Sequence, residues 1–417
     1  MKILRNICRL LLGIVFIYSG FVKGLDPLGS TYKLTDYFNA FSMNWLSSLS
    51  FTFSILLSII EFIIGFCMVF NIRIKWASIG ALIFMSIFTP LTLFIALKNP
   101  VSDCGCFGDA LVISNWDTFL KNIVLIFCAI IVFRDRRKFK SIWTVIDQYF
   151  WLLASIIFMT WLSVCSYQHL PLIDFRPYKT GVNISEEMAI PEGAQTDEYK
   201  SIFKYKNIKT GEVQEFDETN YPWQDTLNWE YVDLRQEIIR EGYRPKINDF
   251  TLIHPFNGDI SEQILSNQGY SFLLISYNIK KYDNSNQDKI NKLAAFCQEY
   301  GHDFYCVTSS LETETQRFAE DNQADYEFCN MDETQLKTII RSNPGLLLLK
   351  NGTIIEKWHN NNIPDVKDLK NRDLLSYCIK DNERNSTKKT ILVIVLIWLV
   401  GLSSYRLRKF KKKHNNN

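Results

Sequence analysis

Long apolar runs and short polar segments alternate over the first 167 residues, and a long polar stretch follows them. A helix that crosses a bilayer needs about 20 mostly apolar residues. On that measure residues 51–70 and 76–97 qualify, and the pattern also predicts transmembrane helices at residues 10–22, 116–133 and 149–167. A sixth apolar run, residues 390–405, lies between Lys388-Lys389 and a basic tail at residues 406–413. We therefore expect a membrane protein with six spans.

Three of the predicted spans depend on how the charges in or beside them are interpreted. The first run follows Arg5 and Arg9 and resembles a secretory signal, but no small-residue cleavage site follows it. We predict a first transmembrane helix, with Arg9 and Lys23 snorkelling at its two ends. For residues 116–133 and 390–405, a buried helix of a soluble domain remains the alternative.

The basic residues predict the orientation of these helices. Arg73, Lys75, the cluster at residues 134–138 and both chain ends fall on one side of the membrane. Short cytoplasmic loops carry an excess of lysine and arginine. Both termini are thus expected in the cytoplasm, and residues 168–388 on the outer face. We expect the inner membrane of a Gram-negative envelope, with a periplasmic soluble part.

The polar half divides into two patterns. Residues 168–245 favour β structure, with a hairpin at residues 202–216. After residue 246 the pattern alternates between strands and helices. Strands are predicted at residues 272–277, 304–308, 346–349 and 354–358, the last two joined by the Asn351-Gly352 turn, and helices at 288–300, 312–320, 333–341 and 366–378. This order predicts an α/β domain.

Composition agrees with a protein that is partly in the membrane and partly soluble. Hydrophobic residues make up 47% of the chain and charged residues 22%. The net charge is only +2, so nothing indicates binding to nucleic acid. The chain has ten cysteines, which are too dispersed for a small disulfide scaffold.

The candidate chemistry lies in a short loop before the fourth predicted span. It contains Asp103, Cys104, Gly105, Cys106, Phe107, Gly108 and Asp109. A disulfide between Cys104 and Cys106 would close a small, strained ring, and strained disulfides are more oxidising. The carboxylates of Asp103 and Asp109 are expected to raise the thiol pKa values. The loop therefore predicts a site that donates a disulfide.

Two other interpretations of this loop stay open. The first is a zinc site, which needs three or four ligands. Two thiolates and two aspartates in one loop could bind zinc only with awkward geometry, so we do not expect a metal. The loop could instead hold a static, structural disulfide. Cys297, Cys306, Cys329 and Cys378 lie in the α/β part, where the sequence cannot decide their pairing.

Glu61 lies in the middle of the second predicted span. A carboxylate inside a membrane is energetically costly and marks a candidate functional position. Lys23 is its candidate partner, although we expect it several ångströms nearer the outer surface. The alternatives are a structural ion pair, a protonated glutamate, or a proton relay in a small-solute transporter.

The membrane part resembles known families. Residues 9–27 read R-L-L-L-G-I-V-F-I-Y-S-G-F-V-K-G-L-D-P and resemble the first helix of the DoxX family, which also tends to carry an acid at the position of Glu61. The Asp-Cys-Gly-Cys-Phe-Gly loop is similar to that of the MauE branch. The resemblance covers residues 1–135 and implies a four-helix membrane bundle. It also implies a role in disulfide maturation of a periplasmic protein.

The element order of residues 246–380 resembles the thioredoxin fold of periplasmic TlpA-type proteins. Pro344, directly before the predicted hairpin, matches the cis-proline position of that fold. Where those proteins carry Trp-Cys-x-x-Cys, residues 277–282 read Tyr-Asn-Ile-Lys-Lys-Tyr. This domain is therefore expected to keep the fold without its redox centre.

These observations combine into one expected organisation. Residues 1–135 form the DoxX/MauE-like bundle, 136–167 a fifth span, 168–245 a β-rich linker, 246–380 the thioredoxin-like domain, and 388–417 a sixth span with a basic cytoplasmic tail.

The expected function is thiol–disulfide exchange with periplasmic client or redox proteins through Cys104 and Cys106. An oxidase of this kind needs an electron acceptor, for which a membrane quinone is the candidate, although no quinone site is evident in the sequence. The rival hypothesis is a non-enzymatic scaffold whose thioredoxin-like domain binds envelope proteins.

Overall fold

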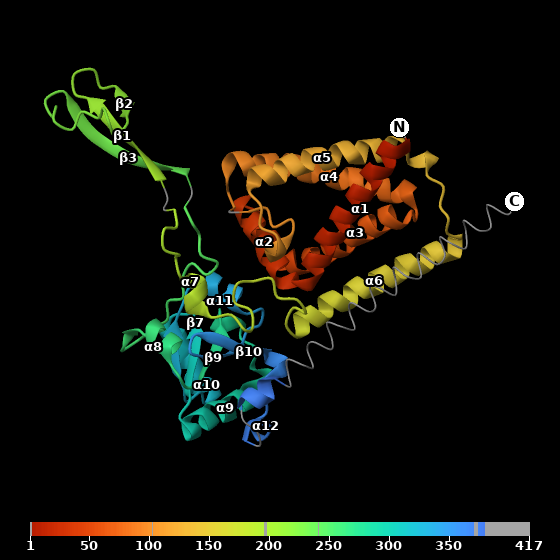
Figure 1. Ribbon diagram of the computed structural model, residues 1–417. Helices are drawn as coiled ribbons and strands as arrows, with labels where there is room; N and C mark the ends of the chain where they lie inside the picture. Colours follow the sequence, from red (N-terminus) through yellow and green to blue (C-terminus); the bar gives the residue numbers. More distant parts are fainter. Residues whose placement is uncertain (1, 102, 196–197, 241, 371–373, 380–417) are drawn as a thin grey trace. The chain divides into compact units, whose positions relative to one another are not determined.

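The computed structural model describes residues 2–101, 103–195, 198–240, 242–370 and 374–379 (Figure 1). The chain forms two compact units. One contains the described residues up to Val182 and from Thr251 onward, and the other is Asn183–Phe250. The predicted span at residues 390–405 and the basic tail lie outside the described residues.

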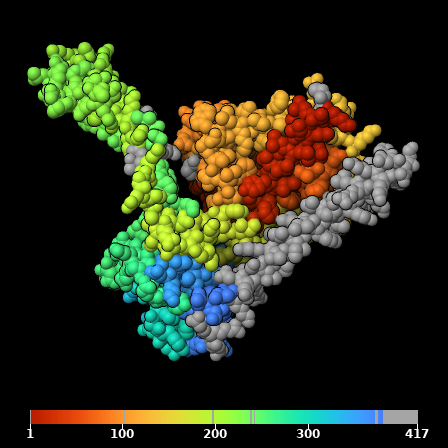
Figure 2. Space-filling model, viewed as in Figure 1, coloured from red at the N-terminus to blue at the C-terminus, as the bar shows by residue number. Residues whose placement is uncertain are grey.

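Five helices in the first unit are long and apolar enough to cross a membrane. They are α1 (Lys2–Leu25), α3 (Ser50–Phe70, preceded by the 3-10 turn Asn44–Leu49), α4 (Ile74–Lys98), α5 (Asn115–Arg134) and α6 (Val145–Gln168). Each coincides with one of the five spans predicted before residue 168. Apolar side chains such as Ile14, Ile83 and Phe127 are exposed on these helices, which suits contact with lipid. The outer face of α1, in red, is visible in Figure 2.

Glycines bring α1 and α3 close together. A Cβ atom on Gly20 would lie 2.5 Å from the backbone nitrogen of Phe62, and one on Gly65 would lie 2.4 Å from that of Ile17. Neither position can therefore hold a larger residue without moving the helices apart. Small residues permit this kind of close packing between membrane helices. The close approach places the polar face of α1 against Glu61 of α3.

A helix that we did not expect follows the first span. Residues 26–50, predicted only as a connection, contain α2 (Pro27–Ala40). Its N-cap is Asp26, whose carboxylate accepts a hydrogen bond from the nitrogen of Gly29 at 2.9 Å. An N-cap aspartate followed by proline is a known helix start. The segment was missed because its polar composition does not resemble a span.

The described carboxyl-terminal part is an α/β region built on one sheet of seven strands, ordered β10-β9-β6-β7-β8-β4-β5. The strands are β4 (Ile253–His254), β5 (Gly258–Asp259), β6 (Ser271–Ser276), β7 (Asp303–Thr308), β8 (Glu327–Asn330), β9 (Gly345–Lys350) and β10 (Thr353–His359). The helices are α8 (Ser261–Ser266), α9 (Gln287–Tyr300), α10 (Glu312–Asn322), α11 (Glu333–Ile339) and α12 (Val366–Lys370). Strands β6, β7 and β8 run parallel, whereas β9 and β10 are antiparallel to their neighbours. The four predicted strands are present; β4, β5 and β8 were not predicted.

The second unit contains an antiparallel sheet ordered β2-β1-β3 and a short helix, α7 (Ile184–Met188). The strands are β1 (Glu198–Asn207), β2 (Val213–Phe216) and β3 (Trp229–Arg240). The first two form the predicted hairpin, whose turn contains Gly211 at a φ of +76°. The long partner strand β3 was not predicted.

Candidate functional site

The Cys-Gly-Cys loop connects α4 to α5 and turns sharply at its two glycines. Gly105 has a φ of +63° and Gly108 a φ of +51°, which are conformations that glycine adopts without steric cost. The nitrogen of Gly108 donates a hydrogen bond to the carbonyl oxygen of Gly105 at 3.1 Å. The backbone between the two cysteines is thereby fixed in one compact turn.

The two thiols of the loop lie next to each other. The Sγ atoms of Cys104 and Cys106 are 2.8 Å apart and share a hydrogen bond. Both cysteines are free, with Cys104 buried and Cys106 partly exposed. The sequence prediction named these two residues as the site, and the structure places their sulfurs in direct contact.

The carbonyl groups of both cysteines are held by side chains from other helices. The Tyr37 hydroxyl of α2 donates to the carbonyl oxygen of Cys104 at 2.6 Å. The Ser19 Oγ of α1 lies 2.7 Å from the carbonyl oxygen of Cys106 and also 2.7 Å from Oε2 of Glu61. Because a hydroxyl has one proton, Ser19 donates a hydrogen bond to only one of these oxygens at a time. Side chains of α1 and α2 therefore hold the backbone of the loop in place.

Lys23 and Glu61 form a buried ion pair behind the loop. The Nζ of Lys23 lies 2.7 Å and 2.8 Å from the two carboxylate oxygens of Glu61, and 3.0 Å from the Oγ of Ser19. The expectation that Lys23 snorkels toward the surface is wrong. Because Gly20 lets α1 approach α3 closely, the Lys23 ammonium reaches the carboxylate inside the bundle instead.

The two aspartates that flank the loop are paired with cations. Lys33 of α2 lies 2.6 Å from Oδ2 of Asp103, whose other oxygen accepts a hydrogen bond from the nitrogen of Gly105 at 2.8 Å. Asp109 lies 3.0 Å from Nη2 of Arg341. Their negative charges are thus balanced locally and act little on the thiols.

The thiol pKa values differ from our expectation. The hydrogen bond from Cys104 lowers the pKa of Cys106 to about 6, and Lys121 contributes in the same direction against the effect of burial. For Cys106 the expected rise is therefore wrong. The pKa of Cys104 is raised, chiefly because it donates that hydrogen bond and is buried, not because of the aspartates. The pair has one thiol prone to ionise and one that stays protonated.

A cavity of about 240 Å³ lies next to the loop, among the helices of the bundle. It is bordered by α1, α2, α3, α4, α5 and the loop itself. Both cysteines line it, together with polar side chains and a larger number of apolar ones. The polar lining includes Ser19, Lys23, Lys33, Tyr37, Glu61, Lys121 and Asn122. The cysteines therefore face a mostly apolar space inside the bundle.

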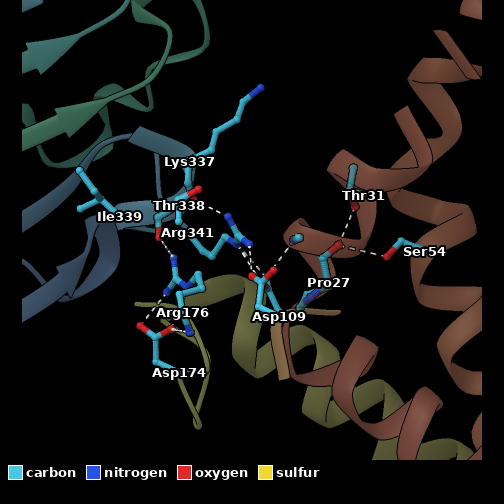
Figure 3. A network of polar contacts seen from close by, with 12 residues as sticks. Pro27, Thr31, Ser54, Asp109, Asp174, Arg176, Lys337, Thr338, Ile339 and Arg341 are labelled. Atoms are coloured by element: carbon cyan, nitrogen blue, oxygen red, sulfur yellow. Dashed lines mark hydrogen bonds and ion pairs between the residues drawn. The ribbon is translucent and has the colours of Figure 1, made fainter. Parts of the chain in front are cut away.

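An arginine of the α/β region contacts the loop and the start of α2. Arg341 lies 3.0 Å from Asp109, and Figure 3 shows the two residues next to each other. The Nε of Arg341 also bonds to both carboxylate oxygens of Asp26, at 2.9 and 3.1 Å. Arg176 bonds to Asp174 and to the carbonyl oxygen of Thr338 in the same network. The burial of Arg341 disfavours its charge, but the two carboxylates raise its pKa and keep it protonated.

The other predicted residues of the α/β region lie near this network. The peptide bond between Asn343 and Pro344 is cis. After β6, a short 3-10 helix spans Ile279–Lys281, and residues 277–282 contain no cysteine. Tyr277, at the end of β6, packs edge-on against Tyr32 of α2 with ring centroids 6.2 Å apart. This end of the sheet therefore contacts the helix that positions the loop.

Several residues of the site were missed in the sequence. They are Ser19, Asp26, Lys33, Tyr37 and Arg341. One signal was present: Ser19 and Lys23 are four residues apart and so share a helix face. The others come from distant segments, whose approach no local pattern reveals.

Comparison with known proteins supports the membrane part. Five helices among the described residues are candidate membrane spans, and residues 1–134 match the family model described as methylamine utilisation protein MauE; together these findings support a membrane protein. This match indicates a redox or methylamine-utilisation context. Residues 199–241 match a domain of unknown function (DUF8463). No curated protein and no solved structure matches the chain.

Proposed function

We propose that the protein is a membrane-bound thiol–disulfide exchange component that oxidises envelope proteins through Cys104 and Cys106. The observation that carries this proposal is the direct contact of the two sulfurs, 2.8 Å apart in a glycine-hinged turn. Two thiols in contact can alternate between the dithiol and the disulfide. The similarity of residues 1–134 to MauE supports the same context.

The exchange transfers two electrons. In the oxidised protein, a partner thiolate attacks Cys104 and forms a mixed disulfide, while Cys106 leaves as the thiolate. Thiols with the lower pKa leave faster, which favours Cys106 as the leaving group. A second partner thiol then attacks the mixed disulfide. The partner gains one disulfide and loses two protons and two electrons, and the loop becomes the dithiol.

The α/β region would bind the partner. Its strands β7, β6, β9 and β10 lie in the order and directions of a thioredoxin-like core, in support of that assignment. Residues 277–282 contain no cysteine, so this region would contribute binding and no redox chemistry of its own. Arg341, which joins it to Asp109, would keep the partner near the loop.

The proposed location is the inner membrane, with the loop on the periplasmic side. Basic residues gather at one end of the helices: Arg5 lies 3.8 Å from Asp135, and Arg73 stacks over the ring of Tyr149. Arg9 donates a hydrogen bond to the carbonyl oxygen of Val69 at this same end. By the positive-inside rule this end would be cytoplasmic.

The test uses the purified full-length protein in detergent. The oxidised protein is mixed with an equimolar reduced two-cysteine peptide, and the disulfides are counted by mass spectrometry. We expect one peptide disulfide for each loop reduced. Cys106→Ser cannot form the loop disulfide and is mixed instead with the oxidised peptide; its Cys104 should attack the peptide disulfide and be recovered after acid quenching as a mixed disulfide with the peptide. The double variant C104S/C106S should transfer nothing. Cys128→Ser, at a buried cysteine of α5, is the matched control and should behave as the wild type.

The rival hypothesis, a scaffold with a static disulfide, makes the opposite prediction. The missing cysteines in residues 277–282 favour it. A loop that stays oxidised in the presence of the peptide, resists mild reductant and traps no adduct would overturn the exchange function and support the scaffold.

A further inference from the structure

The cavity beside the loop has the position of a second substrate site. The loop residues Cys104 to Phe107 all line it, and the rest of its wall comes from the candidate spans α1, α3, α4 and α5 and from α2 with the residues that directly follow it. A different cavity, lined by Gly105, Arg341 and residues 173–176, lies against the α/β region and includes neither cysteine. Partner proteins approach from the soluble phase, so the first cavity is suited to a molecule that arrives through the membrane.

The lining of this cavity suits a flat ring. Six phenylalanines contribute to it: Phe16, Phe38, Phe41, Phe84, Phe88 and Phe107. Aromatic side chains pack well against other planar rings, either stacked or edge-on. Pockets for small organic ligands usually measure about 300–1,000 Å³. The cavity of about 240 Å³ lies below this range, so its ligand would be small: a single substituted ring, with any long tail extending beyond the cavity.

The cavity also holds cations next to the sulfurs. Lys23 and Lys121 line it together with Asn122. The Nζ of Lys121 lies 4.2 Å from the centre of the Phe107 ring, directly beside Cys106. Ammonium groups can donate hydrogen bonds to carbonyl oxygens and favour negative charge that develops on them. The polar side of the cavity is thus suited to a ligand with ring carbonyl groups that become more basic on reduction.

We propose that this cavity binds the ring of a membrane quinone, which reoxidises the Cys104–Cys106 dithiol. This inference rests on the proposed exchange function. In the reaction the two thiols lose two protons and two electrons and the S–S bond forms, while the quinone gains both protons and both electrons and leaves as the quinol. Lys121 is placed to orient one carbonyl group, and the Ser19–Lys23–Glu61 cluster to receive and pass on protons.

The reduced loop needs an acceptor of two electrons, and the cavity opens a second approach to the sulfurs besides that of the soluble partner. A quinone resides in the membrane and accepts two electrons and two protons together. A lipid acyl chain could fill the space as well, but it offers no acceptor for the two lysines. A lipid is therefore an outcome that the test must recognise.

The experiment follows quinone reduction by the reduced full-length protein in detergent. The probe is a fully substituted benzoquinone with a short alkyl tail, because open ring positions would alkylate the thiols directly. Loss of quinone absorbance and loss of thiols are measured together, and we expect one quinone reduced for two thiols. C104S/C106S should reduce none.

Variants that fill the cavity locate the site. Leu57→Trp on α3 and Leu91→Trp on α4 alter two separate walls, so that one remains informative if the other fails to fold. Each should raise the quinone concentration needed for half-maximal rate by about tenfold or more. Ile87→Trp is the matched control, because Ile87 is exposed on the same helix as Leu91 and does not line the cavity. The control should match the wild type.

The peptide exchange assay separates the two proposals. Wild-type protein that exchanges disulfides with the peptide but never reduces quinone would overturn the quinone site and leave the exchange function intact. Equal quinone kinetics in the filled variants and the wild type would place the reaction elsewhere. Co-purified lipid that a quinone cannot displace would assign the cavity to lipid. Failure of the peptide assay itself would instead overturn the proposed function.

Discussion

The Nζ of Lys23 lies 2.7 Å from Oε1 of Glu61, and both side chains are buried inside the helical bundle. Unpaired charges at such a place are costly, which explains why the two occur together. Ser19 joins this pair to the carbonyl oxygen of Cys106 through contacts of 3.0 and 2.7 Å. The charged pair is therefore part of the support of the cysteine loop.

Removing one partner of this pair should destabilise the bundle strongly. Lys23→Met leaves the Glu61 carboxylate buried without its cation, and loss of one partner of a buried pair costs about 3–5 kcal/mol. We expect a clear fall in the thermal unfolding midpoint of the detergent-solubilised protein. The double variant K23M/E61L should recover much of this loss. Lys98→Met, at an exposed lysine, is the control, and a single variant as stable as that control would refute the prediction.

Cys106 should become reactive at an unusually low pH for a thiol. The hydrogen bond from Cys104 and the nearby Lys121 lower its pKa to about 6, and only the thiolate reacts. In the reduced protein, alkylation of Cys106 by iodoacetamide should rise with pH through about 6 and be lost below it. Mass spectrometry of the labelled peptide gives the rate.

Two variants check the causes of that shift. Cys104→Ala and Lys121→Met each remove one group that lowers the Cys106 pKa, so the alkylation midpoint should move to higher pH in both. A midpoint that stays near 6 in both variants would show that neither contact controls the thiolate.

Gly105 should be required for its backbone conformation. A side chain at a φ of +63° costs about 1–2 kcal/mol, and its Cβ would lie 3.1 Å from Cγ of Lys33. Gly105→Ala should therefore slow exchange with the two-cysteine peptide. Gly181→Ala is the matched control, since Gly181 has a φ of +88° but no atom near the added Cβ. Equal exchange rates in the two variants would argue against this role.

The elements that could be predicted from sequence are those with a local signal. The apolar runs predicted α1, α3, α4, α5 and α6, and Asn351-Gly352 predicted the hairpin of β9 and β10. The short strand β8 was missed because its pairing with β7 depends on distant residues. Helix α2 was missed because it is too polar to resemble a span.

The residues of the site also divide into those with a local signal in the sequence and those without one. Cys104 and Cys106 stood out because two residues of rare chemistry lie close in the chain. The ionisation of Cys106 could not be predicted, because it depends on which charges are neutralised in space. Asp103 and Asp109 are adjacent to the loop in sequence, but Lys33 and Arg341 balance them in the fold.

Arg341 should hold the loop against the α/β region. It bonds to Asp26 and Asp109 and donates to the carbonyl oxygen of Lys337. Arg341→Gln removes the charge that bridges the two carboxylates. Because both carboxylates repel each other once that charge is lost, we expect faster hydrogen exchange over residues 104–110 and over α11.

Hydrogen exchange with mass spectrometry on the full-length protein tests this role of Arg341. The control is Arg317→Gln on α10, where the arginine is exposed and lies 3.8 Å from Asp321. That variant should leave exchange over residues 104–110 unchanged. If Arg341→Gln also leaves it unchanged, the arginine does not stabilise the loop, and partner binding by the α/β region would not reach the cysteines through this contact.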